Sequence, residues 1–334
     1  MRYNNIDFNN KTILITGAAG FIGSNLCFYF QKNYPAATVV AFDLFRSGET
    51  FSNGNLKSFG HFKNLIGFRG EVISGDISNK DNLKRLEDFR FDYIFHQAAV
   101  SDTTVSDQKI VVDTNVNAFK DLLDMAVFMK AGMIYASSGA VYGKLPAPHI
   151  VRKEAPINIY GFSKLMMDNL AYEYIKKYDI PIVGLRYFNV YGPREYYKNK
   201  TASMVLQFGL QILSGKKPRL FVGSEKIKRD FVFVEDVIQA NIKACNPKRS
   251  GVYNVATGKA RSFKDIVDIL QSELKTNLEC EYIPNPYEKQ YQFFTQADIE
   301  PTREFLDYEP KYSLEDGIKA DTAYFKKIFK EEVS

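Results

Sequence analysis

A glycine-rich turn near the start of the chain lies between a β-branched run and an amphipathic run, and it limits the folds open to this sequence. The run TILIT (Thr12–Thr16) has the composition of a strand, and Gly17-Ala18-Ala19-Gly20-Phe21-Ile22-Gly23 follows it directly. Small residues here let backbone N–H groups and the N-terminus of the next helix approach a pyrophosphate. Asp43 ends the next strand, where a carboxylate can hold ribose hydroxyls. The pattern predicts a dinucleotide-binding βαβ unit.

Short apolar runs then alternate with longer stretches of helical periodicity. The runs are Thr38–Phe42, Tyr93–His96, Gly132–Ser137 and Pro181–Arg186, and the clearest helical stretches are Asp113–Lys130 and Tyr160–Tyr178. This alternation predicts an α/β fold with a Rossmann-type doubly wound parallel sheet.

Beyond about residue 190, pieces punctuated by Gly and Pro replace the alternation. The length of 334 residues also exceeds the usual size of one domain. We therefore expect residues 1–190, with a later return near 230–258, to form the NAD(P)-binding domain. Residues 191–334 should form mainly a smaller mixed α/β lobe that binds the substrate.

The segment from Leu44 to Gly70 is long for a connection between two strands, so we expect it to lie beside the cofactor. Arg46 can neutralise a 2′-phosphate, which favours NADP, or it can face solvent. Asp76 and Ile77 follow the third strand and should lie near the adenine ring.

Composition excludes several other classes of protein. No stretch reaches the roughly 18 uninterrupted apolar residues of a membrane helix, and the first residues lack a signal-peptide pattern. We therefore expect a cytoplasmic protein with no membrane partner. The net charge of +5 is small for a nucleic-acid binder but suits anionic small molecules. Cys27, Cys245 and Cys280 lie far apart, which predicts reduced, buried thiols and neither a disulfide framework nor a metal site.

Tyr160 and Lys164 lie one helical turn apart, so both side chains can reach one ligand. A free tyrosine titrates near a pH of about 10, and a nearby ammonium should lower that pKa and make Tyr160 an acid or base near neutrality. Ser137 and Ser138 end the preceding strand and can hold a substrate hydroxyl. The Tyr-x-x-x-Lys spacing alone is mostly structural, but its place after a dinucleotide fold and a Ser-Ser pair favours catalysis.

Five motifs together resemble the extended short-chain dehydrogenase/reductase family, whose members modify sugar nucleotides by transient oxidation. They are GAAGFIG (Gly17–Gly23), FHQAA (Phe95–Ala99), YASSGAVYG (Tyr135–Gly143), YGFSK (Tyr160–Lys164) and RYFNVYGP (Arg186–Pro193). The resemblance implies that Ser138, Tyr160 and Lys164 form the catalytic triad. It disfavours dehydration, because Gly139 and Ala140 stand where the dehydratases carry acidic residues.

The substrate-lobe motifs resemble those of family members that epimerise ADP-linked heptoses. The most specific are LFVGSEKIKRDFVFVEDV (Leu220–Val237) and YQFFTQAD (Tyr291–Asp298). The resemblance implies inversion at C6 of the heptose in ADP-D-glycero-D-manno-heptose, for supply of the lipopolysaccharide core. A hydride leaves C6 for the nicotinamide, the 6-keto intermediate turns, and the hydride returns to the other face. Lys198 aligns with the second acid/base of these enzymes, although by itself it reads as a solvated loop lysine.

The resemblance also implies two sets of binding residues. The cofactor set is Gly17, Gly20, Phe21, Ile22, Gly23, Asp43, Leu44, Arg46, Asp76, Ile77, Gln97, Ala98, Ala99, Asn115, Tyr160, Lys164, Val190 and Lys198. The substrate set is Ser101, Ser138, Asn189, Lys200, Gln207, Phe221, Val222, Gly223, Ser224, Arg229 and Tyr291. Within the second set, the fork of donors on Arg229 suits a diphosphate.

Four positions depart from the family pattern. Leu44 and Thr50 replace polar and basic residues beside the cofactor, so NADP is expected and NAD stays possible. Lys200 and Gln207 stand where Ser and His are usual, so the contacts that these two positions make with the substrate can differ.

Two other functions stay open. One is another NAD(P)-dependent sugar-nucleotide epimerase or reductase, such as a 4-epimerase. The other is a redox-sensing protein that binds NADP without chemistry, which the presence of Ser138, Tyr160 and Lys164 disfavours. The family resemblance implies a homo-oligomer.

Overall fold

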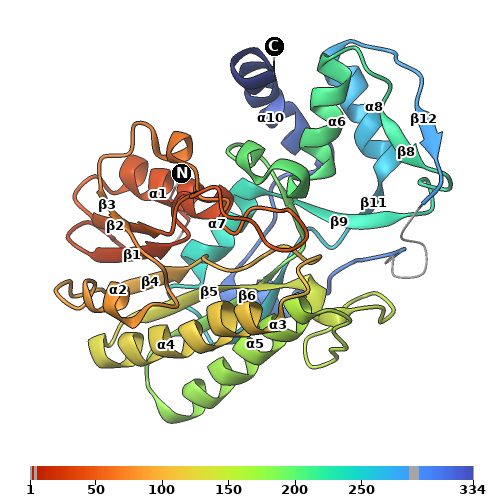
Figure 1. Ribbon diagram of the computed structural model, residues 1–334. Coiled ribbons are helices and arrows are strands. Elements are labelled where there is room, and N and C mark those ends of the chain that lie inside the picture. Colours follow the sequence, from red (N-terminus) through yellow and green to blue (C-terminus); the bar gives the residue numbers. More distant parts are fainter. Residues whose placement is uncertain (1, 4–5, 286–292, 334) are drawn as a thin grey trace.

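A parallel sheet between two helical layers dominates the computed structural model, which describes residues 2–3, 6–285 and 293–333 (Figure 1). Seven strands run in the order β10-β6-β5-β4-β1-β2-β3, and all neighbouring pairs are parallel. They are β1 (Thr12–Thr16), β2 (Thr38–Asp43), β3 (Glu71–Ser74), β4 (Tyr93–His96), β5 (Gly132–Ser138), β6 (Ile182–Tyr187) and β10 (Gly251–Val255). The predicted doubly wound α/β fold is confirmed.

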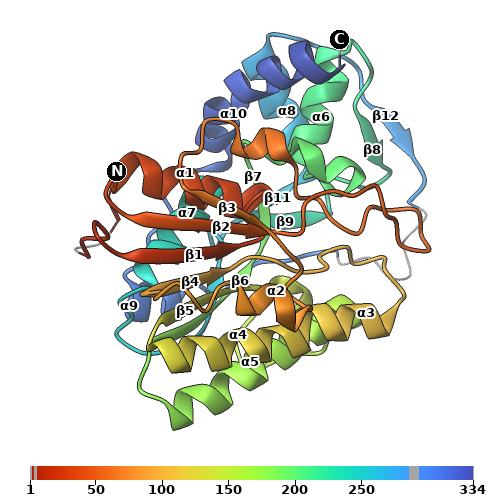
Figure 2. The same ribbon diagram turned by 60° about the vertical axis from the view of Figure 1, so that its left-hand side comes forward.

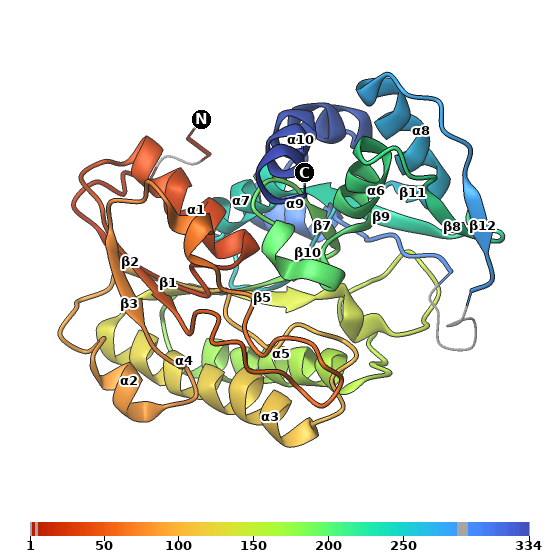
Figure 3. The same ribbon diagram turned by 45° about the horizontal axis from the view of Figure 1, so that its top comes forward.

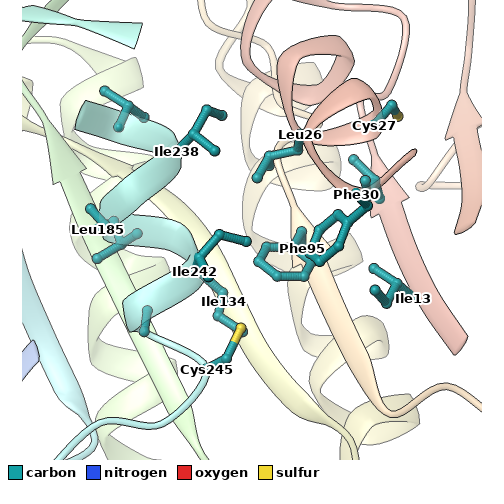
Figure 4. Packing of buried hydrophobic residues seen from close by; sticks show 14 of the residues in the cluster. Ile13, Leu26, Cys27, Phe30, Phe95, Ile134, Leu185, Ile238, Ile242 and Cys245 are labelled. Carbon is teal, nitrogen blue, oxygen red and sulfur yellow. The ribbon is translucent and has the colours of Figure 1, made fainter. Parts of the chain in front are cut away.

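Alternating side chains of the strands divide the core between the two faces of the sheet. Ile13 points to the face covered by α1 (Phe21–Asn33) and α7 (Val234–Lys243), where it belongs to one buried cluster with Phe30 and Ile242 (Figure 4). Leu14 points to the other face, where it joins Phe119 and Met167. The helices of that face are α2 (Lys80–Lys84), α3 (Gln108–Val112), α4 (Ala118–Met129) and α5 (Ile159–Lys177). Both faces are buried, as the apolar strand composition requires.

A smaller lobe lies beside the carboxyl ends of the strands and has its own core (Figures 2 and 3). Its helices are α6 (Met204–Leu213), α8 (Phe263–Leu274) and α10 (Leu314–Ile328). They pack on a three-stranded sheet of β11 (Ala260–Ser262), β9 (Lys228–Phe233) and β7 (Asn189–Tyr191). A two-stranded sheet pairs β12 (Glu281–Ile283) with β8 (Arg219–Phe221). The chain re-enters the large sheet at β10, returns to the smaller lobe through β11, α8 and β12, and then forms α9 (Glu300–Leu306).

One helix starts earlier than its periodicity predicts. The predicted helix Asp113–Lys130 is preceded by α3, and a π-helical turn at Asp113–Asn117 joins α3 to α4. Asp107 caps α3 by accepting a hydrogen bond from the backbone N–H of Ile110 at 3.1 Å. The π turn interrupts the 3.6-residue repeat, so the pattern identifies only the part that follows it.

Two of the three cysteines match the expected burial. Cys27 and Cys245 are buried free thiols in the core under α1 and α7. Cys280 is a free thiol that is only half-buried, because it directly precedes the short edge strand β12. Within the described ranges, no helix combines the length and apolar character needed to cross a membrane.

Candidate active site

A cavity of about 900 Å³ lies where the carboxyl ends of the central strands meet the smaller lobe. In open α/β sheets this is the usual place for a ligand. Its wall includes the glycine-rich turn, the ends of β2, β4 and β5, the start of α5 and loops of the smaller lobe. One volume therefore holds both a candidate cofactor site and a candidate substrate site.

The glycine-rich turn has the shape that a dinucleotide diphosphate needs. Gly17 has a φ of +68°, and a Cβ at Gly23 would lie 2.1 Å from the carbonyl oxygen of Gly17. Gly20 is the N-cap of α1 and brings no side-chain cap, so the first N–H groups of the helix stay open toward the cavity. The described residues fit the phosphates of a nicotinamide dinucleotide.

Asp43 is buried at the end of β2, and backbone groups hold its carboxylate. It accepts hydrogen bonds from the N–H groups of Ala19 at 2.9 Å and Phe45 at 2.7 Å. Burial raises the pKa of Asp43, while these hydrogen bonds oppose the rise. Asp43 lines the cavity, as does the following segment through Leu44 and Lys57. The same segment is hydrogen-bonded to the glycine-rich turn, because the side-chain amide of Asn64 donates to the carbonyl of Ala19 at 3.0 Å.

Two predicted cofactor residues do not line the cavity. The guanidinium of Arg46 donates to the backbone carbonyl of Tyr197. Asn115 lies in the π turn, where its side chain bonds the backbone N–H of Val100 at 2.8 Å, the carbonyl of Val100 at 3.0 Å and the hydroxyl of Ser163 at 2.9 Å. Asn115 therefore links the loop after β4 to helix α5 beneath the cavity. The other predicted cofactor residues all line the cavity.

The start of α5 brings Tyr160 and Lys164 to the cavity together. Lys164 is buried and donates to the carbonyl of Ala136 at 2.7 Å, and its Nζ lies 5.9 Å from the centre of the Tyr160 ring. Burial lowers the pKa of Lys164 to about 8. The expected lowering of the Tyr160 pKa is not found in the protein alone. Burial raises that pKa, and a hydrogen bond with Ser138 opposes the rise, because desolvation of the phenolate dominates at this depth.

A buried polar network separates the roles of the two serines that end β5. Ser137 donates to Asp168 at 3.1 Å, and Asp168 also accepts from Tyr135 at 2.9 Å and from Nε of Arg186 at 2.9 Å. Ser138 instead caps the next turn by accepting from the N–H of Ala140 at 3.1 Å. Ser137, and not Ser138, therefore bonds Asp168, and Ser138 lies beside Tyr160, with which it forms a hydrogen bond.

Lys198 reaches the same cavity from the smaller lobe. It lies in a 3-10 segment, Tyr196–Thr201, between β7 and α6. Its Nζ lies 5.7 Å from the centre of the Phe21 ring in the glycine-rich turn. Burial lowers the pKa of Lys198, and the charge of Glu195 opposes this. Tyr160 and Lys198 are therefore two titratable groups that reach one cavity from different elements.

Only part of the predicted substrate set lines the cavity. Ser101, Ser138, Asn189 and Arg229 do. The amide of Gln207 donates to the carbonyl of Ala202 at 2.7 Å, and Lys200 is exposed. Residues 221–224 form the end of β8 and the turn after it, outside the cavity wall. Tyr291 lies outside the described residues.

Several cavity residues were not predicted. Lys57 belongs to a segment without periodicity, so no pattern singles it out. Thr295 belongs to the motif YQFFTQAD, which could have indicated it. Its hydroxyl is buried and has no hydrogen-bond partner among the described residues, while its N–H donates to the carbonyl of Lys228 at 3.1 Å. Such an unsatisfied group in a cavity wall is suited to bind a ligand.

The fold, the glycine-rich turn and the Ser138–Tyr160–Lys164 group define one class of protein. The chain belongs to the NAD dependent epimerase/dehydratase family, whose sequence profile matches residues 13–256. It is an enzyme of the epimerase type that uses a nicotinamide cofactor.

Solved structures of several epimerases are similar to this chain over nearly its whole length. The chain is 53% identical to the ADP-L-glycero-D-manno-heptose-6-epimerase of Helicobacter pylori, covering 98% of this chain and 99% of that one with a TM-score of 0.90. It is 27% identical to the UDP-glucose 4-epimerase of Thermotoga maritima, covering 95% and 99% with a TM-score of 0.84. It is 30% identical to the UDP-glucuronic acid 4-epimerase of Bacillus cereus, covering 95% and 99% with a TM-score of 0.80.

Proposed function

We propose that this protein inverts C6 of the heptose in ADP-D-glycero-D-manno-heptose to give ADP-L-glycero-D-manno-heptose. The observation that carries the proposal is the placement of Tyr160 and Lys198 at one cavity. Inversion through a ketone needs a proton acceptor on one face of the carbon and a proton donor on the other. The likeness to the Helicobacter pylori enzyme, which extends over both lobes, supports the choice of substrate.

The residues divide the proton transfers between them. Tyr160, hydrogen-bonded to Ser138, takes or returns the proton of the C6 hydroxyl of one epimer, and Lys198 does so for the other. Lys164 keeps a positive charge near the Tyr160 ring and so favours the phenolate during transfer. The nicotinamide, when bound, supplies a reversible hydride acceptor. Because the hydride returns to the same carbon, one turnover leaves no net oxidation.

The preferred cofactor in this proposal is NADP. Lys57 lines the same cavity as Asp43 and can face a 2′-phosphate, while Arg46 of the same segment bonds the backbone of Tyr197. Residues 1–190, together with 230–258, hold the cofactor. Residues 191–334 mainly hold the sugar nucleotide, with Arg229 on its diphosphate and Ser101 and Asn189 nearby.

The remaining substrate contacts are Lys200, Gln207, Phe221–Ser224 and Tyr291, which the family resemblance supports. Lys200, Gln207 and residues 221–224 do not line the cavity, so their contacts require these segments to approach the ligand. The resemblance also supports a cytoplasmic homo-oligomer that supplies heptose for lipopolysaccharide core.

The decisive experiment is incubation with ADP-D-glycero-D-manno-heptose, followed by NMR of the product. We expect a mixture of the two C6 epimers, and an unchanged C6 would refute the proposal. A parallel panel of UDP- and GDP-sugars tests the second candidate, a 4-epimerase or reductase, which the general likeness to the 4-epimerases favours. Cofactor released by denaturation is tested for a 2′-phosphate.

A further inference from the structure

One buried carboxylate closes the loop that carries Lys198. Glu195 is fully buried, and its Oε1 accepts hydrogen bonds from the hydroxyl of Ser203 at 2.8 Å and the N–H of Gly192 at 3.2 Å. Its Oε2 accepts from the N–H of Ser203 at 2.8 Å. Gly192 directly follows β7, and Ser203 caps α6. A single side chain therefore ties together both ends of the loop.

The backbone between these ends is fixed as well. The N–H of Lys198 donates to the carbonyl of Glu195 at 3.0 Å, and the hydroxyl of Thr201 donates to the carbonyl of Lys198 at 2.8 Å. On the other side of Glu195, the guanidinium of Arg194 donates to the side chain of Asn25 on α1 at 3.1 Å. The direction in which Lys198 leaves the backbone thus depends on the anchoring of Glu195.

Glu195 is the hydrogen-bonded carboxyl group of this region. Burial raises its pKa, while the charge of Lys198 and the hydrogen bonds from Ser203 and Gly192 oppose the rise. The titratable groups that act on Glu195 or share its surroundings are Lys198 on the loop, Tyr191 on β7, and Asp321 and Tyr324 on α10. Neither carboxylate oxygen of Asp321 has a hydrogen-bond partner among the described residues, whereas Glu195 accepts three hydrogen bonds. Burial and the charge of Glu195 raise the pKa of Asp321 well above its usual value, which favours its neutral form.

We propose that Glu195 is a positioning residue for Lys198: its carboxylate fixes the loop and balances the nearby ammonium, so that Lys198 stays charged at the cavity wall. The inference rests on the acid/base role proposed for Lys198. Because opposite charges in a buried site hold each other in place, loss of the carboxylate alters both the protonation and the position of Lys198.

The test measures the protonation of Lys198 directly. Trace acetic anhydride labels uncharged amines, so labelling against pH, followed by mass spectrometry, gives a titration midpoint for each lysine that does not depend on accessibility. In Glu195→Gln we expect the midpoint of Lys198 to fall by about one pH unit, which is a tenfold increase in labelling at a pH below the midpoint. Exposed Lys200 should not change. The matched control is Asp236→Asn, because Asp236 is a buried carboxylate that accepts hydrogen bonds from the backbone N–H groups of Lys311 and Tyr312 instead.

A second measurement stays informative if Glu195→Gln does not fold. Lys198→Met removes the ammonium and leaves Glu195 buried without its cation, which raises the folded-state pKa of that carboxyl further. The stability of Lys198→Met relative to Lys200→Met should therefore fall as the pH rises from 4 to 8. An unchanged Lys198 midpoint in folded Glu195→Gln, or equal pH profiles of the two methionine variants, would overturn the inference. Neither readout uses the sugar nucleotide, so failure of the proposed epimerisation is seen separately.

Discussion

The guanidinium of Arg46 donates a hydrogen bond to the backbone carbonyl of Tyr197, the residue directly before Lys198. The ring of Tyr197 also stacks on His61, with ring centres 3.8 Å apart, and its hydroxyl bonds Glu332 at 2.9 Å. The segment beside the cofactor site and the loop of Lys198 are thus joined at one residue. Because Arg46 bonds the backbone of Tyr197, Lys57 and not Arg46 is the basic residue that this segment contributes to the cavity wall.

Lys57→Ala should separate the two cofactors. We expect the Kd for NADP to rise about tenfold and the Kd for NAD to change by less than about twofold, because only NADP carries the 2′-phosphate. Lys57 also pairs with Glu49 at 2.9 Å, so a thermal melt checks that its loss leaves the fold intact. Titration calorimetry on dinucleotide-free protein gives both constants. An equal loss for NADP and NAD would contradict the assignment.

Arg46→Ala should instead lower turnover, since it removes the hydrogen bond that holds the backbone directly before Lys198.

Tyr160→Phe and Lys198→Ala should disable opposite half-reactions. Each variant is given a substrate analogue with a C6 aldehyde, and its oxidation to the carboxylic acid and its reduction to the alcohol are followed separately. We expect losses of about a hundredfold or more in opposite steps, since each residue serves one face of the carbon. Equal loss of both steps in both variants would argue against two acid/base groups.

Lys164→Met should have a stability that depends on pH in a defined direction. The folded-state pKa of Lys164, lowered to about 8, lies below that of the unfolded chain. The buried cation therefore costs stability below pH 8, on the order of 3 kcal/mol, and this cost disappears as the pH rises from about 8 toward 10. The hydrogen bond to Ala136 offsets part of it. Denaturant melts at pH 7 and 10 should show the advantage of Lys164→Met shrinking, with the exposed Lys177→Met as control. A constant difference would contradict burial as the cause.

Thr295→Val and Thr302→Val should change stability in opposite directions. The hydroxyl of Thr295 has no partner among the described residues, whereas that of Thr302 donates to the carbonyl of Asn254 at 2.6 Å. We expect Thr295→Val to raise Tm and to increase KM for the sugar nucleotide about threefold to tenfold, because the ligand loses one hydrogen bond. Thr302→Val should lower Tm and leave KM unchanged. Thermal melts and initial rates decide this, and an unchanged KM in Thr295→Val would remove Thr295 from the substrate site.

The parts of the fold set by local pattern could be predicted from the sequence. The strand Thr12–Thr16 has the predicted bounds, and the Gly17–Gly23 turn and the start of α5 lie where short-range spacing places them. The π turn could not be predicted, because Asn115 forms its hydrogen bonds with residues distant in sequence.

The site shows the same limit. Arg46 and Lys57 are both basic residues of an irregular segment, and only the folded loop decides which of them lines the cavity. Likewise, spacing brings Lys164 to Tyr160 but says nothing of burial, which reverses the expected direction of the Tyr160 pKa shift. The surroundings in the folded protein, and not residue type, decide which basic residue lines the cavity and in which direction the pKa of Tyr160 shifts.

The position of β10 has a consequence for how the chain is made. β6 ends at Tyr187, and its partner β10 begins only at Gly251, after α6 and α7. A nascent chain that has left the ribosome as far as the end of β6 presents that strand as an open sheet edge, which is prone to pair with other chains. Synthesis of the first part of the smaller lobe, through β9, must precede closure of that edge. A fragment cut near residue 190 should therefore aggregate and not survive as an independent nucleotide-binding unit.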